Sequence, residues 1–136
     1  VVERAPHNPR GWHNLGEAYG SDDELEMAVH MYQQAIERVP DFVDARHNLG
    51  QMWLDLGRPA EAEAQFREAL RLRPDDPQTL VGLAGALLGQ GRDADAEAAA
   101  RRAAEASPDL AKAHNNLGVA LARQGRGEEA AASFRE

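Results

Sequence analysis

Four prolines recur at intervals of 34 residues, and this period constrains the fold more than any other feature of the sequence. The positions are Pro6, Pro40, Pro74 and Pro108. Nine residues after each proline stands a leucine, at Leu15, Leu49, Leu83 and Leu117. A repeat of this length is typical of an array of helix-turn-helix units, each too small to bury its apolar face alone. The period therefore predicts an all-α solenoid whose function lies on a surface, and that surface is expected to bind something.

Other residues repeat in the same frame and carry a family resemblance. The first unit contains Trp12, Leu15, Gly16, Tyr19, Ala28, Tyr32, Ala35 and Pro40. This pattern resembles a complete tetratricopeptide (TPR) repeat, and weaker copies of it cover essentially the whole chain. The resemblance implies a right-handed α-solenoid of antiparallel helix pairs, in which the first helix of every pair lines a concave groove.

The repeat frame also divides the chain. Residues 1–8 are expected to be the tail of a preceding repeat, followed by complete repeats at 9–42, 43–76 and 77–110 and a truncated fourth repeat at 111–136. The whole chain is thus predicted to be a single TPR array, cut from a larger TPR protein.

Charge and composition limit the partners. The chain has 15 Lys and Arg against 23 Asp and Glu, a net charge of −8. Nucleic-acid binding needs cations that neutralise phosphates, so no nucleic-acid partner is expected. No apolar run is long enough for membrane insertion. A protein or peptide partner that is neutral or basic remains compatible, and a soluble, cytoplasmic protein is favoured, although the sequence does not identify the compartment.

Residues that carry chemistry are sparse. There is no cysteine, and no two of the five histidines have the i, i+4 spacing of a helical zinc site. The sequence contains neither a glycine-rich phosphate loop nor a nucleophile elbow. We therefore expect no catalysis, no metal and no cofactor.

The binding residues follow from helical geometry. If Leu15 and Tyr19 point into the stack, residues about one position away on the first helix face the groove. The predicted peptide-binding residues are His13, Asn14, Glu17, Asp44, His47, Asn48, Gln51, Asn115 and Asn116.

Asparagine precedes the Leu-Gly pair in three units, at Asn14, Asn48 and Asn116, whereas Gly82 takes this place in the third. A side-chain amide offers donors and an acceptor to the backbone of an extended peptide. The row is similar to the asparagine ladder in the TPR arm of O-linked N-acetylglucosamine transferase. Asparagine is also a common framework residue at this place in TPR units, so both interpretations stay open.

Glycines occur in two kinds of place. Gly57, Gly91 and Gly125 lie between the helices of a unit, where a left-handed residue closes a helix. The first helix of the third unit contains three more, at Gly82, Gly85 and Gly89. Because interior glycines weaken a helix, this unit is predicted to be the softest part of the array.

The leading functional hypothesis is a non-catalytic protein-protein interaction module that holds a peptide segment in its concave groove. One alternative is the substrate-presenting arm of an enzyme, such as a glycosyltransferase, whose catalytic domain is absent. Another is a structural array that self-assembles, with possible head-to-tail contact between copies.

Overall fold

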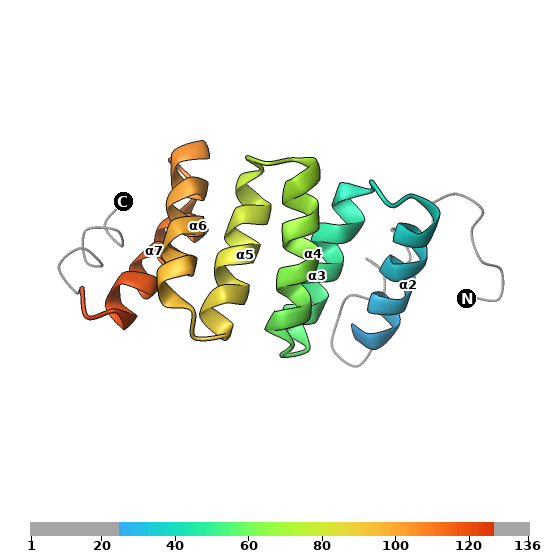
Figure 1. The fold of residues 1–136 in the computed structure, drawn as a ribbon, viewed down its shortest axis with the longest axis horizontal. Helices are drawn as coiled ribbons and strands as arrows, with labels where there is room; N and C mark the ends of the chain where they lie inside the picture. Colours follow the sequence, from blue (N-terminus) through green and yellow to red (C-terminus); the bar gives the residue numbers. More distant parts are fainter. Residues whose placement is uncertain (1–24, 127–136) are drawn as a thin grey trace.

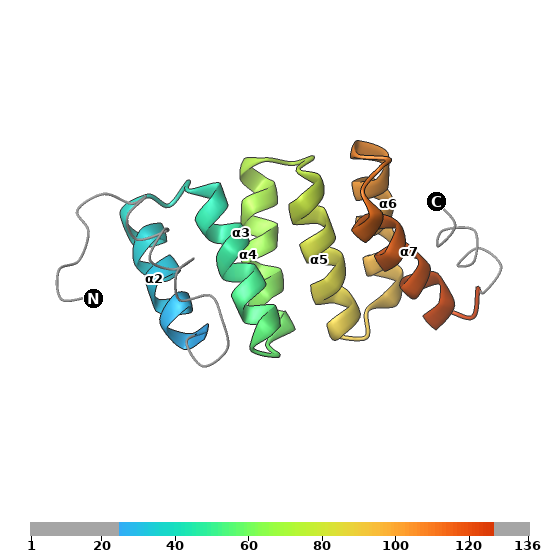
Figure 2. The ribbon, with the colours of Figure 1, turned by 180° about the vertical axis from the view of Figure 1, so that it is seen from behind.

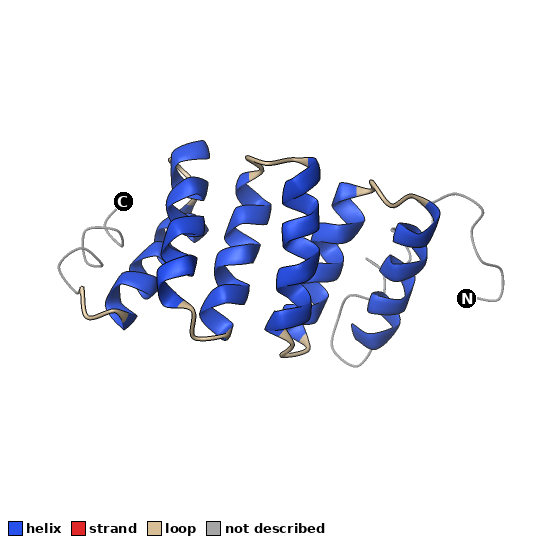
Figure 3. Ribbon diagram, viewed as in Figure 1, coloured by secondary structure: helices blue, strands red, loops and turns tan. Residues whose placement is uncertain are grey.

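The computed structural model describes residues 25–126, and all regular structure in this range is helical (Figure 3). The helices are α2 (Leu25–Arg38), α3 (Val43–Asp55), α4 (Pro59–Leu72), α5 (Pro77–Gly89), α6 (Asp93–Ala106) and α7 (Ala111–Arg123). Short loops join them, and the helices stand side by side in an elongated row (Figure 1). Each helix packs against the next in the chain. This is the α-solenoid that the 34-residue period predicts.

The two helices of a unit are joined by the same turn each time. Gly57, Gly91 and Gly125 have φ angles of +74°, +74° and +78°, the left-handed region that favours glycine. At the first turn the amide of Gly57 donates to Leu54 O and the amide of Arg58 donates to Trp53 O. The same pair of hydrogen bonds recurs one and two periods later, which makes each turn a Schellman motif. The prediction for these glycines is confirmed.

Small side chains form the contact between paired helices. The repeating alanines of α2, α4 and α6 are completely buried, at Ala28, Ala35, Ala62, Ala69, Ala96 and Ala103. Leu49, Leu83 and Leu117 from the first helices are buried as well. Because alanine adds little bulk and has a high helix propensity, it allows close approach without weakening the helix.

Aromatic side chains at repeat positions pack in the core. Tyr32 and Phe66 are buried, and Trp53 and Phe42 are partly buried against core clusters. These four aromatic side chains therefore contribute to the hydrophobic core. Trp12, Tyr19 and Phe134 lie outside the described residues. None of the helices within residues 25–126 is long and apolar enough to cross a membrane.

Candidate functional site

The first helices α3, α5 and α7 form a continuous face, here called the first-helix face (Figure 2). α3 packs directly against α5, and α5 packs directly against α7, although a second helix lies between the two members of each pair in the chain. The second helices α2, α4 and α6 contact mainly the first helices on either side of them. Since the helices of the inner side of an arc lie closer together, the first-helix face is the concave side of the array.

The structure places six of the predicted binding residues on the first helices. Asp44, His47, Asn48 and Gln51 lie on α3, and Asn115 and Asn116 lie on α7. Asp44, Gln51 and Asn115 are exposed, whereas His47, Asn48 and Asn116 are half-buried. His13, Asn14 and Glu17 lie outside the described residues.

Asn116 contributes to the packing between first helices. Its Nδ2 donates a hydrogen bond of 3.2 Å to the backbone carbonyl of Val81 on α5, 35 residues earlier. The structure records no partner for Asn116 Oδ1 among residues 25–126, so an acceptor remains available on this side chain. Asn116 therefore combines a framework contact with an unused acceptor.

His47 is held by a chain of hydrogen bonds that leads away from α3. The Thr79 hydroxyl donates to Asp76 Oδ2 at 2.7 Å and lies 3.2 Å from His47 Nδ1. A hydroxyl has a single proton, so His47 Nδ1 must donate to Thr79, which leaves Nε2 as the acceptor of the neutral ring. Burial lowers the pKa of His47 below its usual value, and the nearby carboxylates of Asp76 and Asp44 offset this only in part.

The side chain of His47 also packs against an aromatic ring. Its ring centroid lies 5.6 Å from that of Phe66 in an edge-to-face arrangement. The neutral form is favoured by this environment, and the imidazole links α3 to α4 and α5. Sequence reasoning assigned His47 to the groove alone and did not anticipate these contacts.

The glycine that interrupts the asparagine row is explained by Phe66. A Cβ atom at position 82 would stand 2.5 Å from Phe66 Cε1, and one at Gly50 would stand 2.8 Å from the same atom. Distances below 3.0 Å are not tolerated by real Cβ atoms, so the ring requires glycine on both neighbouring helices. The interruption is thus explained by packing against Phe66, a contact that the sequence pattern did not predict.

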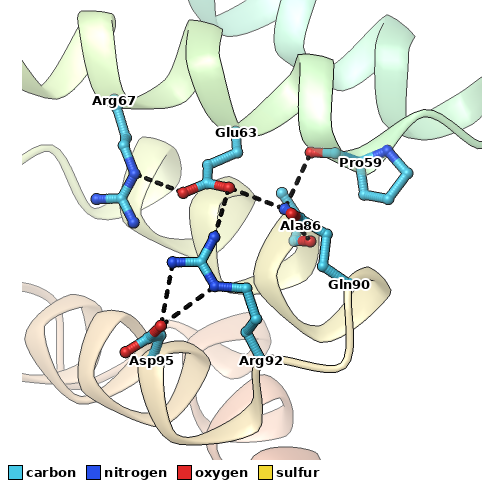
Figure 4. A network of polar contacts seen from close by, with 7 residues as sticks. All are labelled: Pro59, Glu63, Arg67, Ala86, Gln90, Arg92 and Asp95. Carbon is cyan, nitrogen blue, oxygen red and sulfur yellow. Dashed lines mark hydrogen bonds and ion pairs between the residues drawn. The ribbon is translucent and has the colours of Figure 1, made fainter.

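A polar network centred on Glu63, beside the C-terminal end of α5, was not anticipated from the sequence (Figure 4). The carboxylate of Glu63 on α4 accepts hydrogen bonds from Arg67 Nε at 2.6 Å, Gln90 Nε2 at 2.9 Å and Arg92 Nη1 at 2.8 Å. Burial would raise the pKa of Glu63, but these hydrogen bonds and the two arginine charges outweigh it and lower the pKa. The network ties α4 to the end of α5 and to the turn before α6.

The same network recurs one period later. Glu97 accepts hydrogen bonds from Arg101, Gln124 and Arg126 at 3.0, 3.0 and 2.6 Å. The signal was present in the sequence, because each of these residues lies 34 positions after its counterpart. One period earlier, Val29 and Leu56 stand in place of the glutamate and the glutamine. The junction between the first two units is therefore apolar at this place, whereas the two later junctions are ionic.

Solved structures share this architecture. A structure described as "Crystal structure of MamA" aligns with a TM-score of 0.88 at 18% identity, covering 96% of this chain and 77% of that one. MamA residues 41 to the end from Desulfovibrio magneticus RS-1 align with a TM-score of 0.87 at 20% identity, covering 94% and 72%. MamA AMB-1 aligns with a TM-score of 0.80 at 21% identity, covering 98% and 74%. At such identities the likeness shows the fold, a right-handed α-solenoid.

The chain has no significant match among curated protein sequences. The tetratricopeptide repeat family matches it over residues 13–77, 54–111 and 81–136, which together span most of its length. The family match and the shared fold agree with the repeat pattern of the sequence, and the fold is that of a protein-protein interaction scaffold. The chain belongs to the tetratricopeptide repeat family.

Proposed function

We propose that this chain is a protein-protein interaction module that holds an extended segment of a partner protein against its first-helix face. The observation that carries the proposal is the continuity of this face, because α3, α5 and α7 pack directly against one another. Equivalent residues of successive units then form rows across it. One row contains Asn48, Gly82 and Asn116, and the next contains Gln51, Gly85 and Val119.

These rows suit the backbone of an extended peptide. Asn116 Oδ1 is available to accept an amide hydrogen, and the exposed amides of Gln51 and Asn115 offer both donors and acceptors. Between them, α5 presents Gly85 and so leaves room for a partner's side chain. The net charge of −8 favours a neutral or basic segment by long-range attraction.

Site-specific crosslinking tests the proposed face. A photoreactive amino acid is placed at Gln51 or Asn115, which are exposed on first helices, or at Ala64 or Ala98, which are exposed on second helices. Partners from the lysate of the source organism that bind the first-helix face should crosslink from Gln51 and Asn115, whatever is captured from Ala64 and Ala98. Crosslinks that form only from Ala64 and Ala98 would contradict the proposal.

Once a partner peptide is identified, Asn48→Ala should weaken its binding by about 0.5 to 1.5 kcal/mol, the value of one hydrogen bond. Asn116→Ala should weaken binding as well and, because it also removes the hydrogen bond to Val81, it should reduce stability.

The substrate-presenting arm of an enzyme remains the second candidate, and the asparagine row favours it. The two candidates share a face and differ in what is attached to it. A glycosyltransferase-type domain in the same polypeptide would select the second.

A further inference from the structure

Two hollows lie on the second-helix side of the array, one repeat apart. The first, between α2 and α4, has a volume of about 400 Å³ and is lined by Gln33, Gln34, Ile36, Glu37, Leu49 and Gln65. The second, between α4 and α6, has a volume of about 230 Å³ and is lined by Arg67, Leu70, Arg71, Pro74, Leu83 and Arg102. We call them the amide furrow and the arginine furrow.

The two furrows have equivalent floors and different rims. Ile36 and Leu49 form the apolar floor of the amide furrow, and Leu70 and Leu83, each 34 residues later, form that of the arginine furrow. The rim changes from Gln33 and Glu37 to their counterparts Arg67 and Arg71. Because the fold tolerates both rims, the arginines are not required for packing.

The arginines of the second furrow come from two helices and keep much of their surface in solvent. The side chains of Arg67, Arg71 and Arg102 are 51%, 62% and 53% exposed. Arg67 binds Glu63 through Nε, and within residues 25–126 the structure records no contact of its two terminal nitrogens. Arg102 donates to the carbonyl of Pro74. Three guanidinium groups thus surround one apolar hollow in a chain of net negative charge.

We propose that the arginine furrow binds an acidic segment of a partner protein. An apolar side chain of that segment enters the hollow over Leu70 and Leu83, and carboxylates on either side of it meet the guanidinium groups. Arginine suits this role because its planar fork pairs with a carboxylate through two hydrogen bonds.

The surrounding acids favour a peptide over a nucleic acid. Glu63, Glu68 and Asp75 each pair with one of the three arginines, so the surface lacks the extended positive charge that a polyphosphate chain needs. A short acidic segment with a central apolar residue needs only local complementarity. This surface lies on the opposite side from the first-helix face, so the proposal does not rest on the proposed function.

Fluorescence anisotropy with the 136-residue chain tests the proposal. The probe is a fluorescein-labelled synthetic peptide with one leucine flanked on both sides by glutamates. The double variant Arg67→Gln/Arg71→Glu gives the arginine furrow the residues of the amide furrow and should weaken binding about tenfold or more. Arg102→Gln, on the other helix, should also weaken it. The affinity should fall as salt is added, because the arginines are exposed.

Arg101→Gln is the matched control, since Arg101 pairs with Glu97 as Arg67 pairs with Glu63 but does not line the furrow. It should leave the affinity unchanged. Replacing the leucine of the probe with serine should weaken binding, and replacing its glutamates with lysines should abolish it.

Four results would overturn the proposal. These are equal binding by the chain and by both furrow variants, equal binding of the lysine peptide, binding of a labelled single-stranded RNA in place of the acidic peptide, and no binding up to about 1 mM peptide. Circular dichroism establishes that each variant is folded. If the double variant does not fold, Arg102→Gln alone decides.

Discussion

The ring of Phe66 on α4 lies so close to Gly82 on α5 that a Cβ atom at position 82 would stand 2.5 Å from Phe66 Cε1. Phe66 is completely buried, and it reaches Gly50 on α3 in a similar way. One aromatic side chain of a second helix thus fills the space that glycines leave on both neighbouring first helices. One repeat later, α6 carries the small Ala100 in place of Phe66, and α7 carries Asn116 in place of Gly82.

Gly82→Ala should destabilise the protein by about 1 to 3 kcal/mol, the typical cost of overpacking a core. The added methyl group meets a rigid ring, so the ring or the helix must shift. Urea unfolding measures the change. Phe66→Leu should relieve much of this cost in the double variant, and strictly additive effects of the two substitutions would contradict direct contact.

Gly85→Ala, one helical turn further along α5, should have the opposite sign. A Cβ atom there would meet only Leu54 Cδ1 at 3.7 Å, an ordinary van der Waals contact. Alanine is favoured over glycine inside a helix, so stability should rise by about 0.5 to 1 kcal/mol. A loss of stability in urea unfolding would show that position 85 needs glycine for packing.

The softness expected for the third unit stays a prediction. Amide exchange tests it, and should be faster across residues 77–106 than across residues 43–72.

Glu63→Gln should lower the free energy of unfolding by about 1 to 2 kcal/mol, because hydrogen bonds to a charged acceptor are the stronger ones. The side chain of Glu63 is only 15% exposed, and three donors converge on it. Differential scanning calorimetry measures the loss. Glu68→Gln, which removes a more exposed carboxylate that pairs with Arg71, is the control and should have a much smaller effect. Equal effects of the two variants would argue against a stabilising network.

Stability should depend on pH through His47. The folded protein lowers the pKa of His47, so the unfolded chain binds more protons near pH 6 than the folded chain does. This contribution is complete above the unfolded pKa of about 6.5 and is lost as the pH falls through the lower, folded pKa. Urea unfolding between about pH 7 and pH 5 measures it.

His47→Gln should remove this part of the pH dependence, because glutamine keeps a polar group near Thr79 without titrating. His30→Gln is the control, since His30 is exposed on α2. An unchanged pH profile in the His47 variant would mean that the imidazole is not desolvated as the packing indicates.

The sequence by itself determined the architecture. The 34-residue period, the repeating leucines and alanines, and the glycines between paired helices were enough to predict the helices, their order and their turns. They suffice because each unit contacts only its neighbours, so local pattern and tertiary packing carry the same information. The placement of Asp44, His47, Asn48, Gln51, Asn115 and Asn116 on first helices follows from the same register.

Only the tertiary structure decided how individual side chains are used. The period locates Gly82, His47 and Glu63 within a helix, but it does not show that Phe66 reaches α5, that Thr79 accepts from His47, or that Gln90 and Arg92 converge on Glu63. These contacts join side chains on neighbouring helices, and they depend on the distance and rotation between those helices. The repeat sets that geometry on average, and the particular side chains packed at each junction set it in detail.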